Sequence, residues 1–146
     1  MEVNFLRVTA KELFYTAVML QLSRLVNIVY DFPADNAKFE QELNEARSSL
    51  RKKKLLIESS RNGITLDTSL CTCVAFCAEP ENCEVIDVNN YYATVYTASN
   101  FYMLLERAPG DEFLAAWFLN KENLDNYIDS KINESSEKEI NENGQA

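Results

Sequence analysis

Residues 83–119, "CEVIDVNNYYATVYTASNFYMLLERAPGDEFLAAWFL", decide the fold of this chain. They contain four runs rich in β-branched and aromatic residues, separated by Asn89-Asn90, Ser99-Asn100 and Pro109-Gly110-Asp111. The connecting residues Asn, Ser, Pro, Gly and Asp favour tight turns, and connections this short join neighbouring antiparallel strands. The stretch therefore predicts an antiparallel four-stranded meander. Asn120 then caps a predicted closing helix, whose inward residues are Leu124, Tyr127, Ile128 and Ile132.

Alternation along the second run predicts two different faces for this sheet. Tyr92, Thr94 and Tyr96 alternate with Tyr91, Ala93, Val95 and Thr97, so we expect one buried face and one aromatic face open to water. Large aromatic side chains are favoured where proteins bind one another. The candidate protein-binding residues are therefore Tyr91, Tyr92, Tyr96, Phe101 and Tyr102. The alternative is that these side chains are ordinary core residues or cross-strand pairs.

The first half of the chain predicts helices and one small hairpin. Thr9 and Glu12 have the spacing of a capping box, and the apolar residues that follow predict a helix over 9–29. A second helix is expected over 35–53, capped by Asp35 or Asn36. Two short strands around Asn62-Gly63 predict a hairpin, and Asp67 caps a third helix over 68–78. Together with the meander, these elements predict an α+β fold.

The length of 146 residues and the apolar content of 47 % are sufficient for one domain with its own core. We expect a single globular domain over residues 1–132 and a disordered acidic tail over 133–146, which lacks apolar periodicity. No run approaches the roughly 18 apolar residues of a membrane span, and the N-terminus lacks the pattern of a signal peptide. These observations predict a soluble, cytoplasmic protein without a membrane span.

All four cysteines lie within thirteen residues, at Cys71, Cys73, Cys77 and Cys83. Structural zinc sites usually take their ligands from two CxxC-type loops, which this spacing does not match. Disulfides are rare in a reducing cytoplasm. The preferred interpretation is that the cysteines are small buried hydrophobic residues, with Leu70, Val74 and Cys77 forming one apolar stripe of the third helix. A metal or redox role stays open as the alternative.

Composition argues against an enzyme and against a bound cofactor. The chain has no histidine, and its three glycines are too far apart for a phosphate-binding loop. Glu79, Glu81, Glu84 and Asp87 form an acidic group, for which a solvated loop is favoured over a pair of catalytic carboxylates. The net charge of −9 disfavours binding to nucleic acid. The basic run Arg51–Lys54 is explained by the end of a helix, where cations are favourable.

Four segments follow one another in an order typical of a known family: "LRVTAKELFYTAVMLQLSRL", "EARSSLRKKKLLI", "GITLDTSL" and "YYATVYTASNFYMLLERAPGDEFLAAWFLNKENLDNYI". They resemble the EspG-like chaperones of type VII (ESX) secretion. The resemblance spans residues 5–131 and covers one helix-plus-sheet unit, where the mycobacterial members have two. It implies a cytoplasmic chaperone that holds a small helical secretion substrate before export. No individual binding residues are carried across from the family.

The residues also leave two other classes of protein open. Small acidic chains are typical of immunity, antitoxin and phage accessory proteins, which bind a basic partner. The order helix, helix, hairpin also occurs in winged-helix DNA-binding proteins, but the expected third helix contains neither Lys nor Arg. We therefore predict a non-enzymatic protein-binding module whose partner is another protein.

Overall fold

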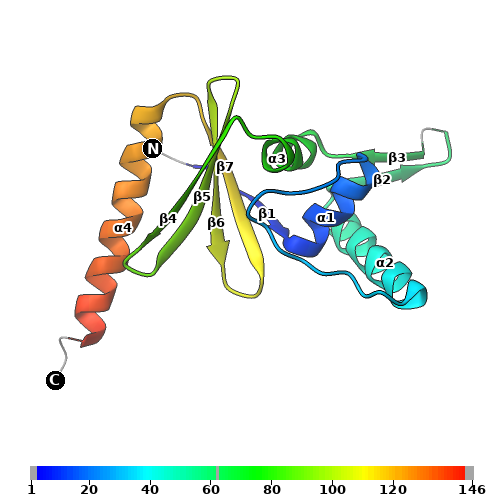
Figure 1. The fold of residues 1–146 in the computed structure, drawn as a ribbon, viewed down its shortest axis with the longest axis horizontal. Helices are drawn as coiled ribbons and strands as arrows, with labels where there is room; N and C mark the ends of the chain where they lie inside the picture. The colour runs from blue at the N-terminus through cyan, green and yellow to red at the C-terminus, as the bar shows by residue number, and fades with distance from the viewer. Residues whose placement is uncertain (1–2, 62, 144–146) are drawn as a thin grey trace.

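A computed structural model describes residues 3–61 and 63–143 of the chain and confirms the α+β fold (Figure 1). Within these residues the first helical part consists of α1 (Ala10–Met19), α2 (Asn36–Lys52), the hairpin β2 (Leu56–Ser59) and β3 (Gly63–Leu66), and α3 (Thr68–Ala78). The main sheet contains β1 (Leu6–Thr9), β4 (Asn82–Val88), β5 (Tyr91–Ala98), β6 (Phe101–Ala108) and β7 (Glu112–Phe118). The chain ends in α4 (Lys121–Asn143).

The predicted meander is present, and its turns follow from local backbone chemistry. Asn89 and Asn90 both have positive φ angles (52° and 67°), as do Ser99 and Asn100 (51° and 67°). Two consecutive residues in this region form the type of two-residue turn whose twist matches a β-hairpin, and asparagine tolerates the conformation well. The turns therefore set the register of β4, β5 and β6.

The sheet has five strands in the described residues, one more than predicted. Its order is β1-β7-β6-β5-β4, because β1 pairs antiparallel with β7, with Leu6 opposite Ala115 and Val8 opposite Phe113. β1 is short and is followed directly by α1. No turn signal marks it in the sequence, and its partner strand lies at the other end of the chain. The predicted four-stranded meander is therefore confirmed as β4 to β7, and β1 is an additional edge strand that was not predicted.

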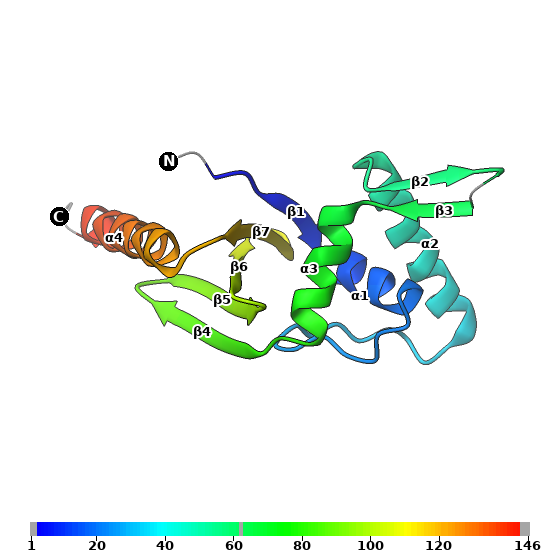
Figure 2. The same ribbon diagram turned by 90° about the horizontal axis from the view of Figure 1, so that it is seen from above.

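Helices cover the sheet on both faces. α1 and α3 lie on one side, with α2 and the β2–β3 hairpin outside them, and α4 lies on the other (Figures 1 and 2). The core on the α1 and α3 side includes Val8, Leu13, Leu50, Leu70 and Tyr96, and the core on the α4 side includes Tyr91, Val95, Leu104, Phe118 and Ile128. The expected aromatic face open to water is therefore wrong, because each face of β5 is covered by a helix.

The predicted helix over 9–29 is also wrong, since α1 ends at Met19. Gln21 has a φ of 58°, and its N–H donates to the Val18 carbonyl while the N–H of Leu22 donates to the Ala17 carbonyl. This pair of bonds is the Schellman motif that ends helices, here with glutamine where glycine is usual. The following loop instead packs on α3 and β5, because the Val26 N–H donates to the Cys77 carbonyl and the Tyr96 hydroxyl to the Val26 carbonyl.

The other helices begin as the sequence predicts. Asp35 caps α2, Asp67 caps α3, and the Asn120 side chain accepts from the Asn123 N–H at the start of α4. α4 continues to Asn143, whereas the predicted tail begins at residue 133. The segment contains no Gly or Pro before Gly144, so nothing in its local chemistry ends the helix earlier. The last predicted tail residues, 144–146, lie outside the described residues, as does Asn62 of the predicted hairpin turn.

One buried carboxylate joins the helices to the edge of the sheet. Glu12 has no exposed surface, and its Oε1 accepts from the Thr9 N–H (2.8 Å) and from Lys53 Nζ (2.7 Å). Its Oε2 accepts from the Ser49 hydroxyl (2.7 Å). Lys53 also donates to the backbone carbonyl of Arg7 in β1 (3.3 Å). The predicted capping box is thus confirmed, and it additionally fixes the end of α2 against β1 and α1.

We predict that Glu12→Gln destabilises the chain by about 3 kcal/mol, because it leaves the Lys53 ammonium without its buried counter-charge. Urea unfolding, followed by circular dichroism, measures the change. Glu45→Gln is the matched control, since Glu45 also pairs with a lysine (Lys11, 2.7 Å) but lies on the surface. An unfolding midpoint that falls equally in both variants, or in neither, contradicts this role of Glu12.

Candidate protein-binding surface

The five predicted binding residues do not share one face of the molecule. Tyr91 and Tyr102 belong to the α4 side of the sheet, whereas Tyr96 belongs to the α1 and α3 side. By strand alternation Tyr92 and Phe101 point to the same side as Tyr96. Tyr96 has no exposed surface and Tyr91 is almost completely buried, while Phe101 is 46 % exposed. They therefore form no continuous surface for a partner.

On the α1 and α3 side, Tyr92 and Tyr96 mainly hold the loop after α1 in place. The Tyr96 hydroxyl donates to the Val26 carbonyl over 2.6 Å, and the Asn27 side chain contacts both Thr94 (2.8 Å) and the Tyr92 hydroxyl (3.4 Å). The Arg107 guanidinium lies over the Tyr92 ring, 4.4 Å from its centre. These contacts show that the side chains of Tyr92 and Tyr96 stabilise the fold.

On the α4 side, a polar cluster lies beneath the helix. The Tyr127 hydroxyl donates to Glu106 Oε1 over 2.6 Å, and Glu106 is almost fully buried. Burial, and then this hydrogen bond, raise the pKa of Tyr127. Burial and the Glu106 charge likewise raise the pKa of Tyr91, whose hydroxyl forms no well-aligned hydrogen bond among the described residues. Both tyrosines are therefore held in the neutral form and stabilise the position of α4.

The four cysteines are all free thiols. Cys73 and Cys77 are completely buried on α3, and Cys77 belongs to the predicted apolar stripe. Cys71 and Cys83 are only half-buried, so the interpretation as buried hydrophobic residues holds for two of the four cysteines. The hydrogen bond with Cys73, and then burial, raise the pKa of Cys77, and burial raises the pKa of Cys71 and Cys83. Within the side chains that the structure describes, no three His, Cys, Asp or Glu come close enough together to bind a metal ion.

A hollow of about 880 Å³ lies where α1, α2 and the β6–β7 turn meet. Its lining includes Lys11, Tyr30, Glu45, Arg107 and Glu112. The Lys11 ammonium hydrogen-bonds Glu45 and lowers the pKa of that carboxyl, and Tyr30 donates to Glu42 beside the hollow. Glu112 accepts from Arg7 at 2.8 Å. The charged groups of this hollow are thus largely paired with one another, so they form part of the helix-to-sheet junction.

Charge is distributed very unevenly along the chain. Residues 1–66 contain ten Lys and Arg against eight Asp and Glu, a net charge of +2. Residues 67–146 contain four against fifteen, a net charge of −11. The second group of residues forms α3, the four meander strands and α4. The negative charge therefore belongs to the meander and to α4, on the side of the molecule away from the basic α2.

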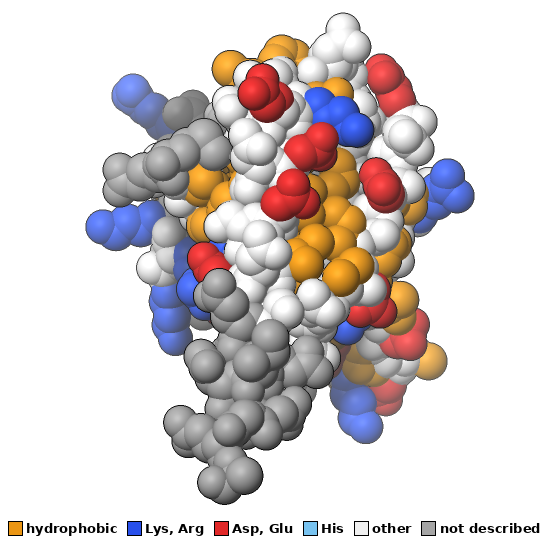
Figure 3. Space-filling model, turned by 90° about the vertical axis from the view of Figure 1, so that its left-hand side faces the viewer, with side chains coloured by type: hydrophobic (Ala, Val, Ile, Leu, Met, Phe, Trp, Pro, Cys, Tyr) orange, Lys and Arg blue, Asp and Glu red, His pale blue; other side chains and the backbone are white. Residues whose placement is uncertain are grey.

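An apolar stripe bordered by acidic side chains lies beside α4 (Figure 3). We call it the β4–α4 surface. Its apolar residues are on the α4 side of the sheet but only partly covered: Ile86 and Tyr102 are half-buried and Val88 is 44 % exposed. Glu84, on the same side of β4, is exposed. The acidic border on α4 consists of Glu122, Asp125 and Asp129.

Helix geometry places those α4 carboxylates toward β4. Leu124 and Ile128 point into the core, and Tyr127 contacts Phe5 (6.0 Å between ring centres) on the β1 side. Successive residues of a helix are rotated by about 100° about its axis, so Asp125 and Asp129 lie on the side of Leu124 and Ile128 that is opposite to Tyr127. This side faces β4. The Lys121 ammonium lies 3.8 Å from the Asp125 carboxylate and pairs with it at the start of the helix. The stripe is thus bordered by negative charge on both sides.

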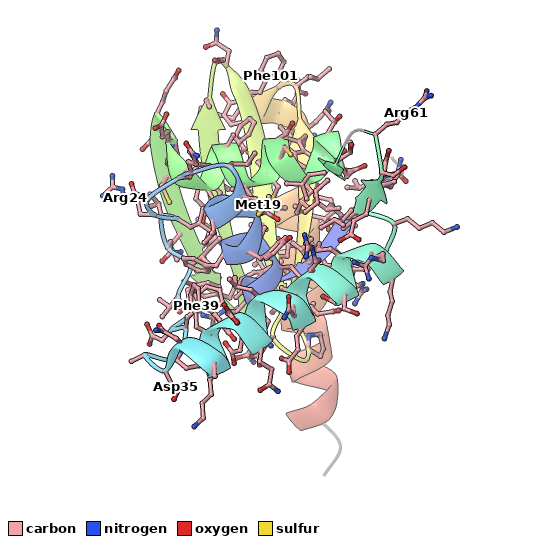
Figure 4. The ribbon with its side chains drawn as sticks, turned by 90° about the vertical axis from the view of Figure 1, so that its right-hand side faces the viewer. Met19, Arg24, Asp35, Phe39, Arg61 and Phe101 are labelled. Carbon is pink, nitrogen blue, oxygen red and sulfur yellow. The ribbon has the colours of Figure 1, made fainter. Side chains whose placement is uncertain are left out.

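A second exposed apolar group lies at the end of α1. Val18, Met19 and Leu20 are 48, 42 and 38 % exposed, and Met19 faces outward between α2 and α3 (Figure 4). Arg24 and Arg61 extend from the neighbouring loop and hairpin in the same view. This group belongs to the part of the chain with a slight positive charge, and no acidic border like that of the β4–α4 surface was found beside it among the described residues.

Sequence reasoning missed the β4–α4 surface for a specific reason. The run from Cys83 to Val88 was expected to form a strand, which β4 confirms, but Glu84 and Asp87 were also grouped with Glu79 and Glu81 as carboxylates of a solvated loop. The two carboxylates within this apolar run were the available signal that the strand lies at an edge of the sheet. Which strand becomes the edge depends on the pairing of β1 with β7 at the far side, and no local pattern contains that information.

No family model matches this chain, and no curated protein is detectably similar to it. Among the described residues, no helix combines the length with the apolar character that a membrane-spanning helix requires.

The state of the cysteines gives a direct chemical prediction. Because alkylation needs the thiolate and the pKa of Cys71, Cys77 and Cys83 is raised, we expect the folded chain to react slowly with iodoacetamide at neutral pH. Raising the pH should label Cys71 and Cys83 before the completely buried Cys77. Mass spectrometry of the modified peptides, with the urea-unfolded chain as control, gives the order. Fast labelling of Cys77 in the folded chain at neutral pH contradicts this arrangement.

Proposed function

We propose that this chain is a non-catalytic module that binds a basic segment of another protein through the β4–α4 surface. One observation carries the proposal: partly exposed apolar side chains lie between two acidic borders, in the part of the chain whose net charge is −11. Apolar contact supplies affinity, and complementary charge selects the partner and speeds its association. Lysine or arginine on the partner would face Glu84 on one border and Asp125 or Asp129 on the other.

Two biological roles are consistent with a basic partner. The sequence resemblance to EspG-like chaperones predicts a helical secretion substrate, and this more specific role rests on that resemblance alone. The alternative is an immunity, antitoxin or phage accessory protein that binds a basic toxin or nuclease, which the concentration of negative charge favours. In both roles the module works through shape and charge, without chemistry of its own.

Affinity purification tests the proposal. The full chain, immobilised, is incubated with an extract of its source cells, and mass spectrometry identifies the proteins that are retained. We expect a basic protein to be retained at low salt and to be released as the salt concentration rises, because screening weakens the attraction between exposed charges. The double variant Asp125→Lys, Asp129→Lys should retain roughly tenfold less of it.

The matched control carries the same charge change elsewhere. Asp31 and Glu40 are exposed and lie on or near α2, away from the β4–α4 surface. Asp31→Lys, Glu40→Lys should retain the partner as the unchanged chain does. Equal loss in both double variants would mean that only the total charge matters, and it would contradict the proposed surface. So would retention that neither variant affects.

A further inference from the structure

Strand β4 is a free edge of the sheet. The sheet order ends at β4, and within the described residues β5 is its only strand partner. β4 is seven residues long, and the hydrogen-bonding groups on its outer side have no strand to pair with. An unpaired edge of this length is a ready template for another strand.

The opposite edge of the sheet is closed. β1 has four residues, carries Arg7, and runs directly into α1. The Lys53 ammonium donates to the Arg7 carbonyl, and the Arg7 side chain pairs with Glu112 of β7. A charged side chain and a bound carbonyl protect this edge from a further strand. The two edges therefore differ in length, charge and cover.

β4 lacks most of the features that usually protect an edge, since its only charged side chains are two carboxylates. Its sequence, "NCEVIDV", contains no lysine, proline or glycine. Val85 and Val88 point to opposite faces of the sheet and are 48 and 44 % exposed, so the strand presents apolar surface on both sides. Glu84 and Asp87 are the charged residues within this apolar surface, and they also point to opposite faces of the sheet. Two carboxylates discourage a strand that is neutral or acidic and favour one that carries lysine or arginine.

We propose that β4 accepts an extended, basic segment of another protein as an additional antiparallel strand. This inference rests on the proposed function and adds the conformation of the bound segment. Main-chain hydrogen bonds to β4 supply affinity, and cross-strand side-chain pairs supply selectivity.

The side chains of β4 predict the pattern of the partner strand. Read from the residue opposite Val88 to the residue opposite Glu84, it is apolar, basic, apolar, apolar, basic. The two basic residues pair with Asp87 and Glu84, and the three apolar residues with Val88, Ile86 and Val85. A second copy of this chain does not match the pattern, since β4 contains no basic residue, and it would bring two strongly negative surfaces together.

A synthetic peptide with this pattern tests the proposal on the full chain. The probe is Thr-Val-Lys-Val-Val-Lys-Thr, and isothermal titration calorimetry at low salt measures its affinity. Two modified probes carry N-methyl groups on alternate backbone amides, one on the odd positions and one on the even positions. Alternate amides of a strand point to opposite edges, so only one of the two modified probes loses the hydrogen bonds to β4.

The expected result is that one N-methylated probe binds like the parent and the other binds roughly tenfold or more weakly, because each lost hydrogen bond costs about 1 kcal/mol. The full chain with Glu84→Lys, Asp87→Lys should lose affinity for the parent probe, and the Asp31→Lys, Glu40→Lys control should keep it. Circular dichroism of each variant verifies that it is folded.

Four results overturn the proposal: equal binding of all three probes, equal loss for both N-methylated probes, no binding of the parent probe at low salt, or a dimer whose β4 is already occupied by a second copy. The failure of this inference is distinct from that of the proposed function. If the protein retained by affinity purification still depends on Asp125 and Asp129 while the probes behave alike, the β4–α4 surface binds its partner, but not as a strand.

Discussion

The buried carboxylate of Glu12 is the interaction on which the arrangement of this molecule depends. It accepts hydrogen bonds from the capping position of α1, from Ser49 of α2 and from Lys53 after α2, and it is completely removed from water. A buried charge is tolerated only when it is paired and its oxygens are hydrogen-bonded, so the partners must stay where they are. Lys53 extends the network to the Arg7 carbonyl of β1. The helices are thereby fixed to one particular edge of the sheet.

Fixing the helices at β1 has a consequence for the other edge. Arg51 at the end of α2 pairs with Glu58, and Lys53 just after α2 pairs with Glu12 and lies near Glu112. The meander and α4 keep an excess of acidic residues. β4, at the far edge, has neither a strand partner outside it nor a cation in its sequence. The same asymmetry that closes β1 leaves β4 with exposed valines and carboxylates, which is why this side of the molecule is proposed to bind a partner.

Local patterns in the sequence predicted most of the helices, strands and turns. Contacts between residues far apart along the chain could not be predicted from them. Asn89-Asn90 and Ser99-Asn100 specify their turns by backbone preference alone, and Asp35, Asp67 and Asn120 specify where helices begin. The end of α1 was missed because Gln21 adopts the left-handed conformation without the usual glycine. β1 was missed because its pairing with β7 joins residues far apart along the chain, such as Leu6 and Ala115. The predicted aromatic residues do not form one surface, because helices cover both faces of β5. The packing of α3 and α4 determines this cover, and no local sequence pattern predicts it.

Hydrogen–deuterium exchange of the full chain, alone and with the basic protein that it retains, tests the central claim most directly. The account predicts that the amides of β4 exchange faster than those of β5 and β6 in the free chain, because the outer side of β4 is open to water. Addition of the partner should slow exchange in β4 and leave α2 unchanged. Protection that increases only in α1 and α2, or a β4 that is already as protected as β5 in the free chain, would contradict the account.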